Sequence, residues 1–266
     1  MKKTANGLVI REVATGESDK LITVLTENEG KLVISAKGAR SIKSKNGALC
    51  RLFTYANFEY YEKSGRYWLA SGEVIDSFFG ITDSIEGLSL AAYIVDVANE
   101  VSGENLADEI LLRATLNTLY AIQKGLRPLP VIKGAYEFFV SAHSGFAPDL
   151  SACERCGGKL DEGFCLDVMN GALLCSECIS HKRLTEFDEL PEFDRFATRN
   201  VLLPLTNEVA RAIDFVIRAD VKRLFSFNLT NEEDRVLFSR AGEIYIKNHL
   251  ERGFDTLDFY HSVTEQ

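Results

Sequence analysis

The sequence predicts an α+β protein with two domains: a small β-barrel of five strands, followed by an all-α domain that carries a four-cysteine module. Three observations support this. Runs rich in β-branched residues fill the first 80 residues, apolar residues recur at helical spacing from residue 83 onward, and five of the six cysteines lie between Cys153 and Cys178. A change from strand-like alternation to helical spacing marks a change of architecture. We therefore expect domains at residues 1–80 and 81–266.

Five stretches of the first domain have the composition of strands: residues 7–13, 21–26, 31–36, 52–62 and 66–79. The turns at residues 28–30 and 63–65 end in Gly30 and Gly65, which favours hairpins because glycine adopts positive φ. Five short antiparallel strands suit a small closed barrel, which leaves no exposed edge. An SH3-like barrel has the same number of strands, so the periodicity alone leaves the type of barrel open.

From residue 83 onward the apolar residues have helical spacing. Asp83 and Glu86 have the spacing of a capping box and predict the start of the first helix; a second helix is expected to end near Gly125, and a third follows it. Beyond the cysteines, a last helix is predicted to begin at Thr230, with Glu233 completing a capping box. The apolar stripes of these helices are predicted to be core: Ala91, Ile94, Val95, Ala98, Leu112, Leu116, Leu119, Val209, Ala212, Ile213, Val216, Leu237, Ala241, Ile244 and Tyr245.

Composition disfavours several classes of protein. The 266 residues are 46% hydrophobic and 26% charged, which are ordinary values for a globular protein and argue against disorder and against a coiled-coil rod. No apolar run approaches the ~20 residues that span a bilayer. The basic N-terminus lacks the apolar region of a signal peptide. We therefore expect a cytoplasmic protein without a membrane partner.

Four of the clustered cysteines have the spacing of a metal site. Cys153 and Cys156 form one C-x2-C pair, Cys175 and Cys178 form a second, and 18 residues separate the pairs. Each pair can bind one ion from a tight turn, and two pairs complete a tetrahedron around Zn²⁺. The spacing predicts one structural zinc ion in a module at residues 151–182.

Two other interpretations of the cysteines stay open, namely reduced metal-free pairs and a redox dithiol, which usually lies at a helix start in a βαβ context. Cys165 and His181 are spare potential ligands, predicted to be a buried residue and an exposed one near a helix end. Four thiolates leave no position for water or substrate, so the site is predicted not to be catalytic. Phosphate-loop, nucleophile-elbow and dinucleotide motifs are missing from the sequence. We expect no enzyme activity; a zinc hydrolase or transferase is the alternative.

The net charge of −9 is unevenly distributed. Residues 1–80 carry 12 Lys and Arg against 9 Asp and Glu, whereas residues 81–266 carry 18 against 30. The loop at residues 36–51, which we call the basic loop, has no acidic residue and five basic ones: Lys37, Arg40, Lys43, Lys45 and Arg51. A basic loop can follow a phosphate backbone and release its counterions, so this one is a candidate nucleic-acid contact that Arg11 and Lys20 could extend. A merely solvated loop is the alternative.

Seven aromatic residues follow the basic loop: Phe53, Tyr55, Phe58, Tyr60, Tyr61, Tyr67 and Trp68. Alternate residues of a half-buried strand face the core, so we expect at least four of the seven to be core residues. An exposed aromatic ring beside a basic groove could stack on an unpaired base.

Taken as a whole, the sequence resembles the bacterial recombination mediator family RecO over essentially the whole chain. The matching segments are GLVIREVATGESDKLITVLTENEGKL, ISAKGAR, GEVIDSF, HSGFAPDL, CERCGG and NGALLCSEC. The resemblance implies an N-terminal OB-fold, a helical C-terminal domain and a zinc module set into the latter. It implies a protein that binds single- and double-stranded DNA, anneals complementary strands and is not an enzyme.

The resemblance also implies partners and sites. The partners are RecR, the acidic C-terminal tail of single-stranded DNA-binding protein (SSB) and, indirectly, the RecA recombinase, which the family helps to load onto SSB-coated DNA. The implied DNA-binding residues are Lys37, Arg40, Lys43 and Lys45, with Arg11 and Arg51 as weaker members. The SSB-tail site is expected near Arg113, Leu116 and Lys133. A zinc-ribbon RNA-binding factor is the alternative to this function.

Overall fold

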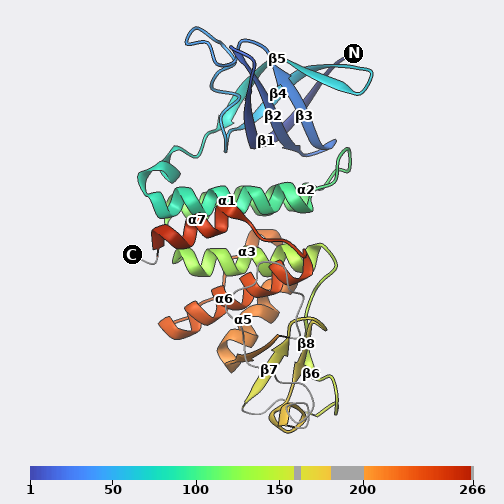
Figure 1. The fold of residues 1–266 in the computed structure, drawn as a ribbon, viewed down its shortest axis with the longest axis vertical. Coiled ribbons are helices and arrows are strands. Elements are labelled where there is room, and N and C mark those ends of the chain that lie inside the picture. The colour runs from blue at the N-terminus through green and yellow to red at the C-terminus, as the bar shows by residue number, and fades with distance from the viewer. Residues whose placement is uncertain (159–162, 181–200, 265–266) are drawn as a thin grey trace. The chain divides into compact units, whose positions relative to one another are not determined.

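A computed structural model of the chain describes residues 1–158, 163–180 and 201–264 (Figure 1). The chain divides into two compact units. The first comprises Met1–Gly125 together with the chain from Thr256 onward, and the second comprises Leu126–Asp255. The change from strands to helices falls near residue 80, as predicted. The boundary between the two compact units lies elsewhere, at residue 125, because the helices that follow the barrel belong to the same unit as the barrel.

A five-stranded closed barrel forms the N-terminal part of the first unit, as predicted. Its strands are β1 (Lys2–Thr15), β2 (Asp19–Thr26), β3 (Gly30–Ala36), β4 (Tyr55–Lys63) and β5 (Arg66–Asp76). They close in the order β1-β2-β3-β5-β4. This order is that of the OB-fold, which decides the type of barrel that strand number alone left open.

One pairing of the barrel differs from the antiparallel expectation. Strands β3 and β5 run parallel, with Ile34 opposite Tyr67 and Ser35 opposite Trp68, while the other four pairings are antiparallel. The reason is the long basic loop after β3, which carries the chain across the barrel so that β4 pairs with β1. The β4–β5 hairpin then returns β5 alongside β3.

The two predicted hairpin turns are confirmed. Gly30 has φ 69° and Gly65 has φ 72°, values that side chains with a Cβ rarely adopt. Inside the barrel, alternate strand residues form one apolar cluster, which includes Val9, Ile22, Ile34 and Phe58. Burial of this inward face is what holds the sheet closed.

Helices complete the first unit: the short η1 (Phe79–Asp83), α1 (Ile85–Val101), α2 (Glu109–Lys124) and α7 (Asp255–Thr264). The predicted capping box at Asp83 is wrong by one residue, because the Ser84 hydroxyl caps α1 by accepting from the Gly87 backbone N–H at 2.9 Å. Helix α2 ends where predicted, since Gly125 adopts the left-handed conformation with φ 58°.

The second unit is helical except for a small sheet around the cysteines. Its helices are α3 (Leu129–His143), α5 (Asn207–Arg218), η2 (Val221–Arg223) and α6 (Glu232–His249). Strands β6 (Asp149–Cys153), β7 (Phe164–Asp167), β8 (Ala172–Leu174) and β9 (Leu202–Leu205) form a sheet in the order β6-β8-β7-β9. The start of α6 is capped by Asn231, not Thr230, and α7 follows the helix that was predicted to be the last.

Helices α3 and α6 pack closely through glycines. A Cβ on Gly134 would lie 2.8 Å from the Phe238 ring, and a Cβ on Gly242 would lie 2.8 Å from a carboxylate oxygen of Glu137. This close approach buries three charged groups together. Lys133, whose side chain is 1% exposed, lies 3.0 Å from Glu137 and 2.9 Å from Glu243.

The buried Lys133 is held as a cation by its two neighbours. Burial by itself lowers the pKa of the amine, but the carboxylates of Glu137 and Glu243 outweigh burial and raise that pKa. The amine also donates to the Ser239 carbonyl oxygen at 3.3 Å. The prediction that Lys133 contacts a partner needs correction, because the side chain is enclosed between α3 and α6 and its charge is already compensated.

Replacing Lys133 with methionine should destabilise the protein strongly. The change keeps the length of the side chain but leaves two buried carboxylates facing each other without a cation, and breaking such a group costs about 3–5 kcal/mol. Urea unfolding measures the loss.

The loss should shrink as the pH falls from 8 to 5, because both carboxyl groups of Lys133→Met would have raised pKa values in the folded state and protonation would relieve the repulsion. Arg211→Ala, which removes an exposed cation of α5, should leave the urea midpoint nearly unchanged. A Lys133→Met protein as stable as the parent at pH 8 would contradict the buried ion group.

Candidate nucleic-acid interface and metal centre

The basic loop is anchored by apolar residues in the barrel core. Ala39, Leu49 and Cys50 are buried and belong to the same cluster as the inward-facing strand residues. Burial raises the pKa of the Cys50 thiol to about 11, so this cysteine packs as a neutral side chain. The loop therefore covers part of the barrel core instead of hanging free from it.

Hydrogen bonds fix the loop further at its start and in its second half. The Gly38 backbone N–H donates to Asp19 Oδ1 at 2.8 Å, and the Arg40 backbone N–H donates to the Ser18 carbonyl oxygen at 2.9 Å. In the second half of the loop, Asn46 Nδ2 donates to the Ala70 carbonyl oxygen of β5 at 3.3 Å. The loop is braced against the β1–β2 turn and against β5, so its cations are held on a defined surface.

All five cations of the basic loop are exposed. Lys37, Lys43, Lys45 and Arg51 make no ion pair with any carboxylate in the part of the chain that the structure describes. The Arg40 guanidinium donates to the Gly16 carbonyl oxygen at 3.2 Å and is not paired with a carboxylate there either. Their charge is available to an anionic ligand. Arg11 on β1 is exposed too, and it has no ion pair within residues 1–158, 163–180 and 201–264.

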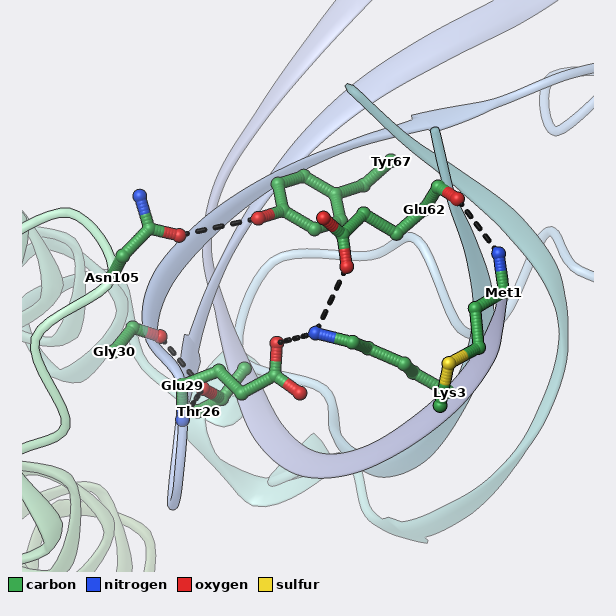
Figure 2. Close-up of polar contacts among 8 residues, drawn as sticks. All are labelled: Met1, Lys3, Thr26, Glu29, Gly30, Glu62, Tyr67 and Asn105. Atoms are coloured by element: carbon green, nitrogen blue, oxygen red, sulfur yellow. Dashed lines mark hydrogen bonds and ion pairs between the residues drawn. The ribbon is translucent and has the colours of Figure 1, made fainter. Parts of the chain in front are cut away.

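Other cations of the barrel are neutralised. Lys20 lies 2.5 Å from Glu12 and also donates to the Cys50 carbonyl oxygen at 3.3 Å, so it does not extend the basic surface as a free charge. Figure 2 shows Lys3 between two carboxylates, 2.9 Å from Glu62 and 3.2 Å from Glu29. Hydrogen bonds to Glu62 and Glu29 raise the pKa of Lys3. Within the described residues, the basic loop is therefore the stretch of the barrel that gathers the most cations without a carboxylate partner.

The structure shows which of the seven aromatic residues after the basic loop are buried and which are exposed, a distinction that the sequence analysis left open. Phe53, Phe58 and Tyr60 are buried, and Tyr67 packs on the barrel core. The Tyr61 side chain is 51% exposed. Trp68 is half-buried. Strand alternation was the available signal: once Tyr60 is assigned to the core, its neighbour Tyr61 must face outward.

The four paired cysteines meet in the second unit. Cys153 ends β6, Cys175 follows β8, and Cys178 lies in the helical stretch 176–180. Their sulfur atoms, with that of Cys156, all lie within 4.8 Å of one another. The turn after Cys153 needs Gly157, whose φ is 67° and whose N–H donates to the Cys153 carbonyl oxygen at 2.8 Å.

The geometry of this cluster fits a tetrahedral metal ion. Metal–sulfur bonds of about 2.3 Å would place the sulfurs of a tetrahedron about 3.8 Å apart. The distance between Cys156 Sγ and Cys175 Sγ is 3.8 Å. The four cysteines are thus a group that could hold a metal ion, as the spacing predicted.

The electrostatics of the sulfurs also favour a cation. Burial raises the pKa of the Cys153 thiol, but backbone N–H groups outweigh it and make the net shift downward. One donor is the N–H of Cys175, 3.4 Å from Cys153 Sγ. Burial and the neighbouring sulfurs raise the pKa of Cys178. The first thiolate therefore forms easily and further ionisation needs a compensating positive charge, which a bound metal ion supplies.

The structure places one of the two spare ligand candidates outside this group. Cys165 is buried on β7, as predicted, and its sulfur is not among the four that converge. His181 lies outside the described residues.

The residues proposed for a protein partner are divided between the two compact units. Arg113 and Leu116 lie on α2 of the first unit, whereas Lys133 lies on α3 of the second. The Arg113 guanidinium, about half exposed, lies 2.5 Å from Glu109 one turn earlier, and Leu116 is half-buried. Arg113 is therefore exposed and Leu116 partly exposed, whereas Lys133 is buried and not available to a partner.

The second unit contains a groove of about 690 Å³ beside α5. Arg211, Arg218 and Arg223 line it, but so do Asp214 and Asp220, and Arg218 lies 2.7 Å from Asp214. This mixture of charges distinguishes the groove from the basic loop. As for membranes, no helix within the described ranges is both long and apolar enough to cross one.

The fold and its sites define a class: OB-fold proteins whose barrel carries an exposed cationic loop and whose chain continues into a helical part with a four-cysteine module. Residues 1–78 match the family described as "Recombination protein O N terminal", and residues 83–186 match "Recombination protein O C terminal". The chain belongs to the RecO family of DNA repair proteins.

Similar proteins cover almost the full length of the chain. The DNA repair protein RecO of Acetivibrio thermocellus is 32% identical over 255 residues, covering 96% of this chain and 94% of the relative. The RecO protein of Halalkalibacterium halodurans is 28% identical over 242 residues, covering 91% and 87%. That of Caldicellulosiruptor saccharolyticus is 25% identical over 256 residues, covering 96% of each.

Proposed function

We propose that this protein is a recombination mediator that binds single- and double-stranded DNA through the basic loop and anneals complementary strands. The observation that carries the proposal is the set of five exposed cations, without carboxylate partners in the described structure, on a braced loop of an OB-fold barrel in a RecO-family chain. Lys37, Arg40, Lys43 and Lys45 would make the main phosphate contacts, with Arg11 and Arg51 at the margin.

The loop would act by electrostatics. Each cation that approaches a phosphate releases a condensed counterion, and this release drives binding of any sequence. Neutralised strands repel one another less, so two complementary strands held at the loop can approach and pair. The work is done by binding alone, and no bond of the DNA is made or broken.

The four-cysteine module is proposed to hold one zinc ion with a structural role. Zn²⁺ accepts four thiolates in a tetrahedron, and Cys153, Cys156, Cys175 and Cys178 offer four converging sulfurs. A bound zinc ion would tie β6, β8 and the stretch 176–180 together. A sheet of strands only three to five residues long gains much of its stability from such a tie.

Protein partners complete the proposal. We expect the chain to act in the cytoplasm at the nucleoid, together with RecR, the acidic SSB tail and, through them, RecA. Holding the SSB tail through one surface and DNA through another raises the local concentration of DNA at the basic loop. Arg113 and Leu116 of α2 stay our proposal for the tail contact, because they combine an exposed cation with an apolar neighbour.

Strand annealing on SSB-coated oligonucleotides tests this function. The protein should accelerate annealing of coated strands, and removal of the SSB tail should abolish the acceleration while annealing of bare strands continues. Arg113→Ala should slow annealing of coated strands several-fold and leave bare strands unaffected. Arg211→Ala is the matched control, since Arg211 is also an exposed helical arginine paired with a glutamate on its own helix. Equal annealing with full-length and tailless SSB would contradict the tail contact.

A further inference from the structure

We propose that Tyr61 and Trp68, on the outer face of the barrel, form a stacking surface for the bases of an unpaired DNA strand. The inference rests on the proposed function, because it places the bases of the strand whose phosphates the basic loop would hold. It adds a base-contacting site and a preference for unpaired DNA.

The two aromatic side chains lie side by side on the outside of the barrel. Tyr61 of β4 is directly opposite Trp68 of β5 in the antiparallel pairing. Their sequence neighbours face inward: Tyr60 is fully buried, and its ring meets that of Tyr67 edge to face at 5.8 Å. Because strand residues alternate between faces, the buried Tyr60–Tyr67 pair fixes Tyr61 and Trp68 on the opposite face.

Trp68 lies close in the sheet to two points of the basic loop. Ser35 of β3 is paired with Trp68, and the first loop cation, Lys37, follows Ser35 by two residues. Farther along the loop, Asn46 Nδ2 donates to the carbonyl oxygen of Ala70, two residues after Trp68. The loop therefore starts beside Trp68 in the sheet and contacts β5 again two residues beyond it.

Further cations lie beyond the aromatic pair. Lys63 and Arg66 face each other across the β4–β5 hairpin, two residues from Tyr61 and Trp68. Both are exposed, and neither forms an ion pair in the part of the protein that the structure describes. Glu59, two residues before Tyr61 on β4, is compensated by Lys2 at 3.0 Å.

The resulting order is cations of the loop, two aromatic rings, and cations of the hairpin. Proteins that bind single strands combine a positive track for the phosphates with aromatic rings on which bases stack. In a duplex the bases already stack on one another and their faces are covered. The aromatic pair should therefore contribute to binding of single strands, and the loop cations to both forms.

The chain offers a direct probe, because Trp68 is its one tryptophan. In the unmodified full-length protein, titration with a thymidine oligonucleotide should quench the fluorescence of Trp68, whereas a duplex of the same length should leave it nearly unchanged. Fluorescence anisotropy of labelled DNA gives the affinities in parallel. Tyr61→Ala and Trp68→Ala should each weaken single-strand binding at least fivefold and duplex binding less than twofold, with Trp68→Phe retaining most of the affinity.

Tyr120→Ala is the matched control, since Tyr120 is similarly exposed, at 47%, but lies on α2; it should bind like the parent. If the parent binds single strands in a salt-dependent manner while the Trp68 emission stays constant, the stacking surface is wrong and the proposed function stands. Equal quenching by duplex and single strand would also overturn it. If instead the parent binds no DNA, the proposed function fails as well.

Discussion

Replacing Lys37, Arg40, Lys43 and Lys45 together with alanine should make single-strand binding much less sensitive to salt. On single strands each phosphate contact contributes about 0.7 to the slope of log affinity against log salt, so losing four contacts should reduce the slope by about 3. The affinity at low salt should fall as well, by tenfold or more, and duplex binding should fall with it. Anisotropy titrations over a series of salt concentrations measure both quantities.

The control must remove the same charge from elsewhere. Lys124, Arg211, Arg218 and Lys222 are four exposed cations on helices α2, α5 and η2. Their joint replacement with alanine changes the net charge equally and should leave the salt slope within experimental error of the parent. A slope reduced equally in both variants would show that overall charge, and not the basic loop, governs binding.

The second large effect is expected at the cysteines. The double variant Cys153→Ser, Cys156→Ser should lose about one zinc ion per chain and lower the stability of the second unit by several kcal/mol, because binding of a structural zinc ion is coupled to folding of its module. Metal analysis of the purified protein and thermal unfolding with and without a chelator measure the two losses.

Cys165→Ala provides the comparison for the cysteine variant. Cys165 is buried in the same apolar cluster as Cys153 but its sulfur is outside the converging four, so this variant should keep its metal. Salt-dependent DNA binding should survive in the double serine variant, since the cysteines and the basic loop belong to different compact units. A parent protein that contains no zinc, or a Cys165→Ala protein that loses it, would contradict the proposed module.

Much of the fold could be predicted because it follows from local patterns. The strands of the barrel alternate, Gly30 and Gly65 mark the hairpins, and the stripe from Val209 to Val216 matches the buried face of α5. The helix starts were misplaced by one residue where two capping residues adjoin, as at Asp83 and Ser84. Either side chain can cap a helix, and only the path of the preceding chain selects one.

Features that depend on distant parts of the chain could not be predicted. The parallel β3–β5 pairing depends on which strand β4 pairs with after the basic loop. The alternation of apolar and polar residues along a strand does not specify its partner. Lys133 looked like a surface cation because its partner Glu243 lies more than a hundred residues away in sequence. The convergence of the four cysteines, in contrast, was predictable, because the spacing within each cysteine pair already brings two sulfurs to one turn.

The central claim is that the basic loop is where DNA binds, and protection of individual lysines from an amine-reactive reagent tests it most directly. Bound single-stranded oligonucleotide should slow modification of Lys37, Lys43 and Lys45 in the full-length protein, while Lys124 and Lys222 react as fast as in free protein. Unchanged reactivity of the three loop lysines under saturating DNA, or protection of Lys124 and Lys222 instead, would contradict the account.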